Sequence, residues 1–232
     1  MTLTDIYKGS PRNYVSVDCV IFGYEDYELK LLLFQREIEP EKGGWSLLGG
    51  FCGEDESLEN AAARVLDKTT GLTDIFMDQV QAFSSVDRDP GGRVISIVFY
   101  ALIPIFQQNK EKVNRKGAKW FPVNDLPELI FDHSEMVENA MKKLQLRASY
   151  HLVGRELLTE QFTLMQLRSL YEAIFQKELD PGNFRKKVLS LKLLERLNKK
   201  NTTESKKGAY LYKFVSEPEK SNERILKVNI SL

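Results

Sequence analysis

The segment GGFCGEDESLENAAARVLDKTTGL, residues 49–72, decides how the N-terminal part of this chain is expected to fold. Glycine occupies three of its first five positions, and an acidic stretch follows. From residue 57 onward apolar residues recur at helical spacing, and Gly71 is a typical helix stop. The segment therefore predicts a glycine-rich loop that leads into a helix with one buried face.

The residues around this segment predict a mixed sheet. Runs of alternating β-branched and aromatic residues indicate strands at 14–22, 29–36, 75–86, 93–105 and 118–121. A second amphipathic helix is expected from about residue 132 to residue 147. Strands flanked by two helices predict an α/β/α sandwich over residues 1–150.

Residues 151–232 show a different pattern, one of helices and then strands. Thr163 and Gln166 form a capping-box signature for one helix, and Asp180 followed by Pro181 marks the start of another. The apolar face of this second helix continues through Leu191 and Leu194, and a strand at 209–215 follows, with 223–230 as its expected partner. This order predicts a C-terminal winged helix-turn-helix domain, which makes the whole chain α+β.

Charge divides the chain at the same place. The 232 residues hold 33 Lys and Arg and 33 Asp and Glu. Residues 1–150 carry 17 basic and 23 acidic side chains, a net charge of −6, whereas residues 151–232 carry 16 and 10, a net charge of +6. An acidic body with a basic appendage suggests that the appendage binds an anion. Two cysteines and the lack of an 18-residue apolar run favour a cytoplasmic protein without membrane contact.

The segment at 49–72 also resembles a Nudix box. Gly50, Glu56 and Arg64 keep the spacing of that motif, and Gly71 with Leu72 ends it. Where the family has three metal-binding glutamates, this chain has Val65, Lys68 and Thr69. Magnesium prefers oxygen ligands that neutralise its charge. The resemblance therefore implies a Nudix fold with no catalytic residues, no metal site and no cofactor, so not an enzyme.

The resemblance continues well beyond the box. The stretches DRDPGGRVISIVFYALIP, FTLMQLRSLYEAI and LDPGNFRKKVLSLKLLE are similar to the family of Nudix-related transcriptional regulators. This implies a homodimeric repressor that leaves double-stranded operator DNA when a small effector binds its Nudix-like domain. The altered box is most similar to the arabinose-responsive branch, which implies L-arabinose as effector. Two alternatives stay open: an ADP-ribose-responsive regulator of NAD metabolism, and a nucleoside-diphosphate hydrolase with an atypical metal site.

Five residues are candidates for effector binding. Asp18 lies within an apolar strand, where a carboxylate needs a partner that is either a ligand hydroxyl or an internal donor. Trp45 precedes the glycine loop and either stacks on a ligand or fills the core, and Gln35 is a weaker candidate. Arg88 and Asp89 belong to a turn that either covers the cleft or forms a solvated ion pair. Asp132 and His133 are better explained by helix capping.

The candidate DNA contacts lie in the second helix of the C-terminal unit and in the loop after it. They are Asn183, Arg185, Lys186 and Lys187 in the first helical turns, with Lys206 and Lys207 at the expected wing tip. Arg and Asn suit bidentate pairing with bases, whereas Lys more often contacts phosphate. The alternative is a solvated helix face with no partner.

Overall fold

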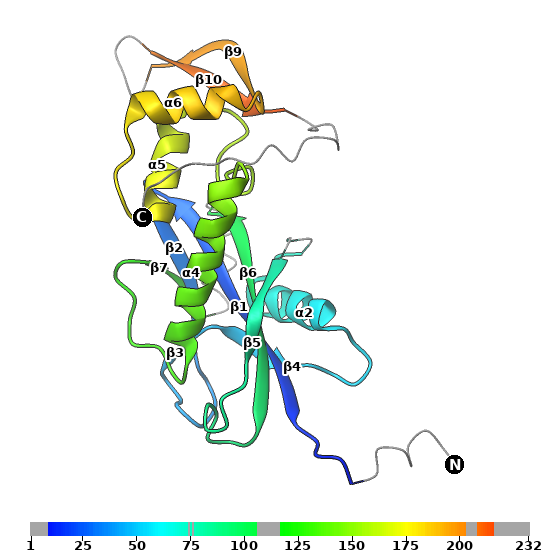
Figure 1. Ribbon diagram of the computed structural model, residues 1–232. Helices are drawn as coiled ribbons and strands as arrows, with labels where there is room; N and C mark the ends of the chain where they lie inside the picture. The colour runs from blue at the N-terminus through cyan, green and yellow to red at the C-terminus, as the bar shows by residue number, and fades with distance from the viewer. Residues whose placement is uncertain (1–8, 74, 76, 106–116, 203–207, 216–232) are drawn as a thin grey trace, which may run out of the picture.

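A computed structural model describes residues 9–73, 75, 77–105, 117–202 and 208–215. Within these ranges an N-terminal sandwich is followed by a smaller unit of helices and a three-stranded sheet (Figure 1). No helix in these ranges has both the length and the apolar character needed to cross a membrane. The α+β class and the order of the two units are therefore as the sequence predicts.

The N-terminal unit is built on a seven-stranded sheet with the main order β3-β2-β1-β6-β5. Strand β4 also pairs with β1, and β7 pairs with β2. The two long central strands β1 and β6 run parallel, and all other pairs are antiparallel. The strands are β1 (Tyr14–Glu25), β2 (Glu28–Gln35), β3 (Trp45–Ser46), β4 (Leu48–Phe51), β5 (Met77–Phe83), β6 (Val94–Pro104) and β7 (Ala118–Pro122).

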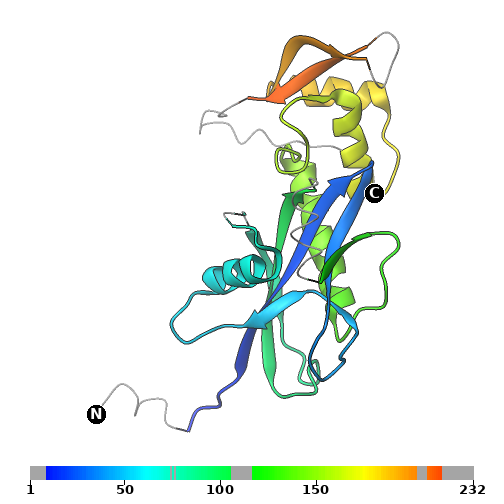
Figure 2. The ribbon, with the colours of Figure 1, turned by 180° about the vertical axis from the view of Figure 1, so that it is seen from behind.

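Two helices cover opposite faces of this sheet, as Figure 2 shows from behind. Helix α2 (Leu58–Thr70) is capped by the Ser57 side chain and ends at Gly71, whose φ of 71° suits glycine. Its apolar face joins one core with β1 and β6, whereas the apolar face of α4 (His133–Tyr150) joins another. The predicted α/β/α sandwich is confirmed.

The C-terminal unit contains two helices and a small sheet of order β8-β10-β9. Its elements are β8 (Phe162–Thr163), α5 (Leu164–Phe175), α6 (Pro181–Ser190), β9 (Leu194–Asn201) and β10 (Ala209–Phe214). The predicted capping box is present, because Thr163 and Gln166 each bond the other's backbone amide. Asp180 accepts a hydrogen bond from the amide of Asn183 at the start of α6.

Two details of the predicted C-terminal unit are wrong. Helix α6 ends at Ser190 and does not continue to Leu194, because Lys192 has a positive φ of 59° that a right-handed helix cannot contain. Leu194 instead begins β9, which is the hairpin partner of β10. Residues 223–230, the expected partner, lie outside the described residues.

The two units share one apolar core. Buried residues between the sheet and α4 form a single cluster with those of α5 and α6, among them Leu144, Leu167 and Val188. Polar contacts join the same elements, since Gln145 Nε2 donates to the carbonyl of Ile174 at 2.9 Å. Helix α4 therefore packs against both the sheet and the C-terminal unit.

Candidate functional site

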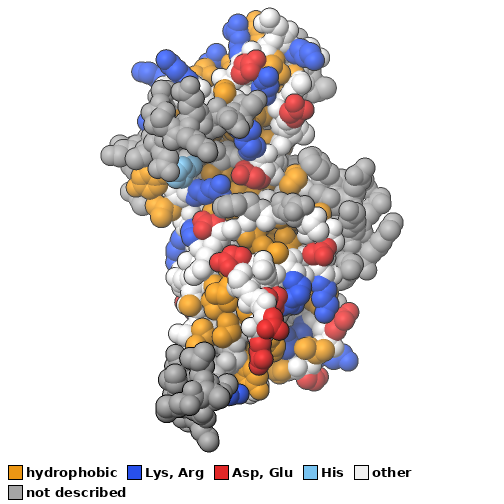
Figure 3. Space-filling model, turned by 90° about the vertical axis from the view of Figure 1, so that its right-hand side faces the viewer, with side chains coloured by type: hydrophobic (Ala, Val, Ile, Leu, Met, Phe, Trp, Pro, Cys, Tyr) orange, Lys and Arg blue, Asp and Glu red, His pale blue; other side chains and the backbone are white. Residues whose placement is uncertain are grey.

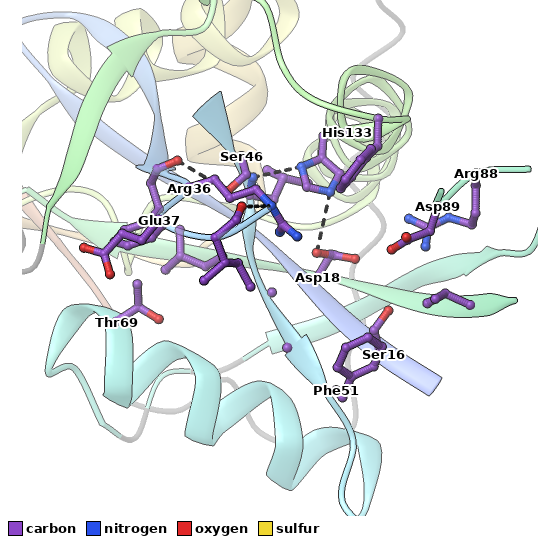
Figure 4. Close-up of a pocket in the computed structure, with 18 of the residues that line it drawn as sticks. Ser16, Asp18, Arg36, Glu37, Ser46, Phe51, Thr69, Arg88, Asp89 and His133 are labelled. Carbon is purple, nitrogen blue, oxygen red and sulfur yellow. Dashed lines mark hydrogen bonds and ion pairs between the residues drawn. The ribbon is translucent and has the colours of Figure 1, made fainter. Parts of the chain in front are cut away.

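A cavity of about 490 Å³ opens on the N-terminal unit beside the glycine-rich loop. Its size lies in the range typical of sites for small molecules. Figure 4 shows Asp18 and His133 in the middle, Arg36 and Glu37 on one side, and Arg88 and Asp89 on the other. The lining residues are Ser16, Asp18, Phe34, Arg36, Glu37, Ile38, Ser46, Leu47, Leu48, Gly49, Gly50, Phe51, Lys68, Thr69, Arg88, Asp89, Val94, Phe131 and His133.

Asp18 lies on the central strand β1 and lines this cavity. Its side chain is buried and accepts a hydrogen bond from Ser96 Oγ at 2.5 Å. On the neighbouring strand β4 the residue opposite Asp18 is Gly49. A Cβ atom at Gly49 would collide with Asp18 Oδ1. Gly49 thus leaves the space that the carboxylate occupies, and Asp18 has both an internal donor and access to the cavity.

This close approach makes Gly49→Ala a test of the local packing. We expect the substitution to lower the free energy of unfolding by about 1–3 kcal/mol, the usual cost of overpacking. Urea denaturation measures this change. Gly182→Ala is the matched control, because a Cβ there meets its nearest atom, Asp180 Oδ1, at an ordinary 3.4 Å. Equal stability of the two variants would contradict the proposed collision.

His133 begins helix α4 and faces Asp18 across the cavity. Its Nδ1 accepts a hydrogen bond from the amide of Leu47 at 3.1 Å, so the neutral ring carries its proton on Nε2. Nε2 lies 3.8 Å from Asp18 Oδ1. Burial lowers the pKa of His133, although the nearby carboxylate of Asp18 opposes the shift. The cavity therefore presents a neutral N–H donor beside a carboxylate acceptor.

The lowered pKa of His133 has a consequence for stability. The folded state binds fewer protons than the unfolded chain near the ordinary value of 6.5, so stability is full above that pH and is lost as pH falls below it. We expect His133→Gln to flatten the dependence of unfolding free energy on pH between 5 and 7. The other histidine, His151, is exposed and is the control. Flattening by His151→Gln instead would contradict the assignment.

Capping does not explain Asp132 and His133, contrary to the expectation from sequence. Asp132 occupies the N-cap position but makes no side-chain capping bond. Its two carboxylate oxygens accept hydrogen bonds from Nε and Nη2 of Arg88, both at 2.8 Å. Arg88 is almost fully buried, with its side chain 4% exposed. The turn at 84–93 is therefore held on the start of α4 by a partly buried ion pair and also lines the cavity through Arg88 and Asp89.

Arg36 is a cavity residue that the sequence did not indicate. Its Nε donates to the carbonyls of Ile38 and Pro40, at 3.0 and 2.6 Å, and its guanidinium carbon lies 5.4 Å from the centroid of the Phe131 ring. The two terminal nitrogens have no hydrogen-bond partner among the residues that the structure describes. The side chain is thus fixed while two donors remain available to an anion.

Two predicted effector residues lie outside the cavity. Side chains alternate along β2, so Phe34 and residue 36 line the cavity while Gln35 points away and donates to the carbonyl of Gly43 at 3.0 Å. Trp45 packs edge-on against Phe121, with ring centroids 4.8 Å apart. Trp45 therefore belongs to the core and Gln35 to a loop contact.

Helix α2 has no carboxylate cluster at the cavity. Glu56 is held by Arg64 in two hydrogen bonds of 3.0 and 2.5 Å, which lower the pKa of Glu56 to about 2. Val65 is buried, and Lys68 and Thr69 line the cavity. Across the described ranges no group of three or more His, Cys, Asp or Glu side chains is placed to hold a metal ion.

The basic face of the C-terminal unit is a separate candidate site. Arg185 and Lys186 of α6 are exposed and Lys187 is half-buried, and none of them pairs with an acidic residue in the part of the chain that is described. Asn183 is also exposed. Figure 3 shows Lys and Arg side chains at the end of the molecule that this unit forms. Lys206 and Lys207 lie outside the described residues.

Comparison with known proteins relates both units to one family. Residues 12–140 match the NUDIX domain, and residues 154–214 match the NrtR DNA-binding winged helix domain. Shewanella oneidensis NrtR, solved in complex with a 27mer DNA, is 33% identical, with a TM-score of 0.77 over 87% of this chain and 93% of that chain. Its Nudix domain, solved in complex with ADP ribose, is 32% identical, with a TM-score of 0.52 over 62% of this chain and 99% of that chain.

Two further relatives differ in what they do. The ADPR responsive transcriptional repressor NtrR of Acinetobacter baylyi is 28% identical over 208 residues, which cover 88% of this chain and 83% of the relative. An ADP-ribose pyrophosphatase of Methanocaldococcus jannaschii is 37% identical over 131 residues, which cover 56% of this chain and 77% of the relative. The repressor extends through both units, whereas the pyrophosphatase match spans little more than half of this chain.

Proposed function

The chain belongs to the NrtR family, in which a Nudix domain precedes a DNA-binding winged helix domain, and from this membership we propose that it is an ADP-ribose-responsive transcriptional repressor. One observation carries the proposal. A cavity lined by Arg36, whose terminal nitrogens are available, lies in the Nudix domain, and that domain shares its core with a winged helix in which Arg185 and Lys186 are exposed and have no acidic partner among the described residues. A domain boundary near residue 150 is part of the same proposal.

ADP-ribose replaces L-arabinose as the preferred effector. The Acinetobacter baylyi repressor, which matches both domains, is named for its response to ADPR, and the Nudix domain of Shewanella oneidensis NrtR was solved with ADP ribose. The cavity supports the same choice, because Arg36 and Lys68 both line it. A diphosphate places negative charge against such cations, whereas neutral arabinose offers them only hydroxyl acceptors. Asp18 and Nε2 of His133 are suited to ribose hydroxyls.

Helix α4 is the proposed link between effector and DNA. Its first turn contacts the cavity through His133 and the ion pair of Asp132 with Arg88. Near its other end, Gln145 bonds the last turn of α5. An effector changes operator affinity only if it binds two arrangements of the protein with different affinities. We propose a homodimer, since a palindromic operator requires two winged helices about one DNA turn apart, roughly 34 Å.

The experiment begins with duplexes that the protein itself selects from a random DNA pool. Binding to a selected 27-base-pair duplex is then measured by fluorescence anisotropy with ADP-ribose, with L-arabinose and with neither. We expect ADP-ribose alone to weaken binding. Release by arabinose alone would restore the arabinose assignment, and the absence of any selected sequence would overturn the repressor proposal.

A hydrolase is the second candidate, and the identity to an ADP-ribose pyrophosphatase favours it. The positions that would hold metal are Val65, Lys68 and Thr69, which supply no carboxylate. We therefore infer that the protein binds ADP-ribose without cleaving it. Incubation with ADP-ribose and Mg²⁺ or Mn²⁺, followed by chromatography for AMP, tests this inference. Turnover at many equivalents per protein would establish the hydrolase.

A further inference from the structure

The β9–β10 hairpin carries two cations that share one aromatic ring. The guanidinium carbon of Arg196 lies 4.6 Å from the centroid of Tyr210, and Nζ of Lys200 lies 4.9 Å from the same centroid. Tyr210 itself is 40% exposed, so the ring packs in no core. These distances are within the range of favourable cation–π contact.

The strand register explains why the three side chains meet. Arg196 and Lys200 are four residues apart on β9, so both lie on one face of the hairpin. Tyr210 stands opposite Lys200 on β10, and an irregularity in the pairing lies between Tyr210 and Tyr212, the residue opposite Arg196. The ring is therefore placed between the two cations by the hairpin itself.

The charges of these cations are not neutralised within the described residues. Arg196 and Lys200 form no ion pair there, whereas Lys213 on the same hairpin pairs with Glu195 at 3.1 Å. An aromatic ring holds a cation without cancelling its charge, as a carboxylate would. It also restricts two long side chains that would otherwise lose rotamer freedom on binding.

We propose that Tyr210 is a positioning residue for DNA binding, which holds Arg196 and Lys200 in place against the phosphate backbone. This face of the hairpin would be a second DNA contact beside helix α6, and the inference rests on the proposed repressor function. Phosphate is the partner that fits, because Lys and Arg donate to phosphate oxygens and the ring holds both positive charges side by side on an exposed strand face.

The first test removes the charges. The double variant Arg196→Ala with Lys200→Ala is titrated against a selected duplex at several salt concentrations, as full-length protein. Each lost phosphate contact lowers the slope of log affinity against log salt by about 0.9, so a decrease of roughly 1.8 is expected. The control Lys213→Ala, with a neutralised lysine on the same hairpin, leaves the slope unchanged.

The second test removes the ring. Tyr210→Leu is expected to weaken operator binding roughly fivefold, because two cation–π contacts are lost, whereas Tyr210→Phe keeps the ring and most of the affinity. Thermal unfolding separates the two possible roles. If Tyr210 were merely structural, Tyr210→Leu would lose thermal stability as well as operator affinity, whereas a positioning residue loses affinity alone. An unchanged slope in the double variant, with normal binding by the unaltered protein, would overturn this proposal alone. A lack of binding by the unaltered protein would overturn the proposed function instead.

Discussion

Operator affinity is expected to fall by a factor of roughly 10² to 10⁴ when Arg185, Lys186 and Lys187 are all replaced by alanine. These side chains lie in the first two turns of α6, the part of a recognition helix that reaches base edges. Arg185 and Lys186 are exposed, so their loss changes no core contact. Anisotropy titrations at several salt concentrations measure the effect. The slope of log affinity against log salt is expected to be smaller by up to about 2.7.

Single variants should separate the roles of these residues. Lys186→Ala and Lys187→Ala are expected to weaken binding to all sequences and to lower the salt slope by about 0.9 each. Arg185→Ala should also relax the choice of base, which a repeated selection experiment measures. Lys142→Ala, an exposed lysine of α4 in the Nudix domain, is the control. A triple variant that binds like the unaltered protein would place α6 away from the DNA.

Loss of either partner of the Arg88–Asp132 ion pair is expected to lower the free energy of unfolding by about 3–5 kcal/mol. The pair is bidentate, and Arg88 is almost fully buried, so removal of one charge leaves the other without compensation. Urea denaturation of Arg88→Ala, Asp132→Ala and the double variant gives the coupling between them. The loss of unfolding free energy in the double variant should be much smaller than the sum of the losses in the two single variants.

The same pair should also affect effector binding. Arg88 and Asp89 line the cavity, and Asp132 precedes the helix that carries His133. Arg88→Ala is therefore expected to weaken ADP-ribose binding in calorimetry at temperatures where the variant is still folded. The exposed pair of Arg64 with Glu56 supplies the control, because Arg64→Ala should alter stability far less. If Arg88→Ala and Asp132→Ala each lowered the free energy of unfolding by less than about 1 kcal/mol, the pair would be solvated and without structural importance.

Local patterns were sufficient to predict the longer strands and helices of the N-terminal unit, but not β4 (Leu48–Phe51), most of which was expected to belong to a glycine-rich loop. The alternation of β1, the apolar face of α2 and the capping box of α5 each arise from neighbours in sequence, and the structure has all three. The β9–β10 hairpin was not predicted correctly. Strand β9 has the sequence LERLNKKN, which is mostly charged and polar and shows no alternation of apolar and polar residues. Its pairing with β10 depends on contacts between the two strands, which the propensity of each strand alone does not specify.

Side-chain direction limited what could be predicted of the cavity. Gln35, the last residue of β2, points away from the cavity, whereas the next residue, Arg36, lines it. His133 was assigned to capping because its partners Leu47 and Asp18 are remote in sequence. Asp18 could be recognised because a carboxylate within an apolar strand needs a partner wherever the strand lies.

The apolar core that continues from the sheet through α4 into α5 and α6 has a thermodynamic consequence. Because Leu144 of α4 belongs to the same cluster as Leu167 and Val188, neither domain can lose its structure without uncovering apolar surface on the other. The two domains should therefore melt as one cooperative unit. An effector bound to the first would protect the second from unfolding by the same free energy. The Nudix and winged helix domains are therefore not interchangeable modules, because each supplies apolar side chains to the core of the other.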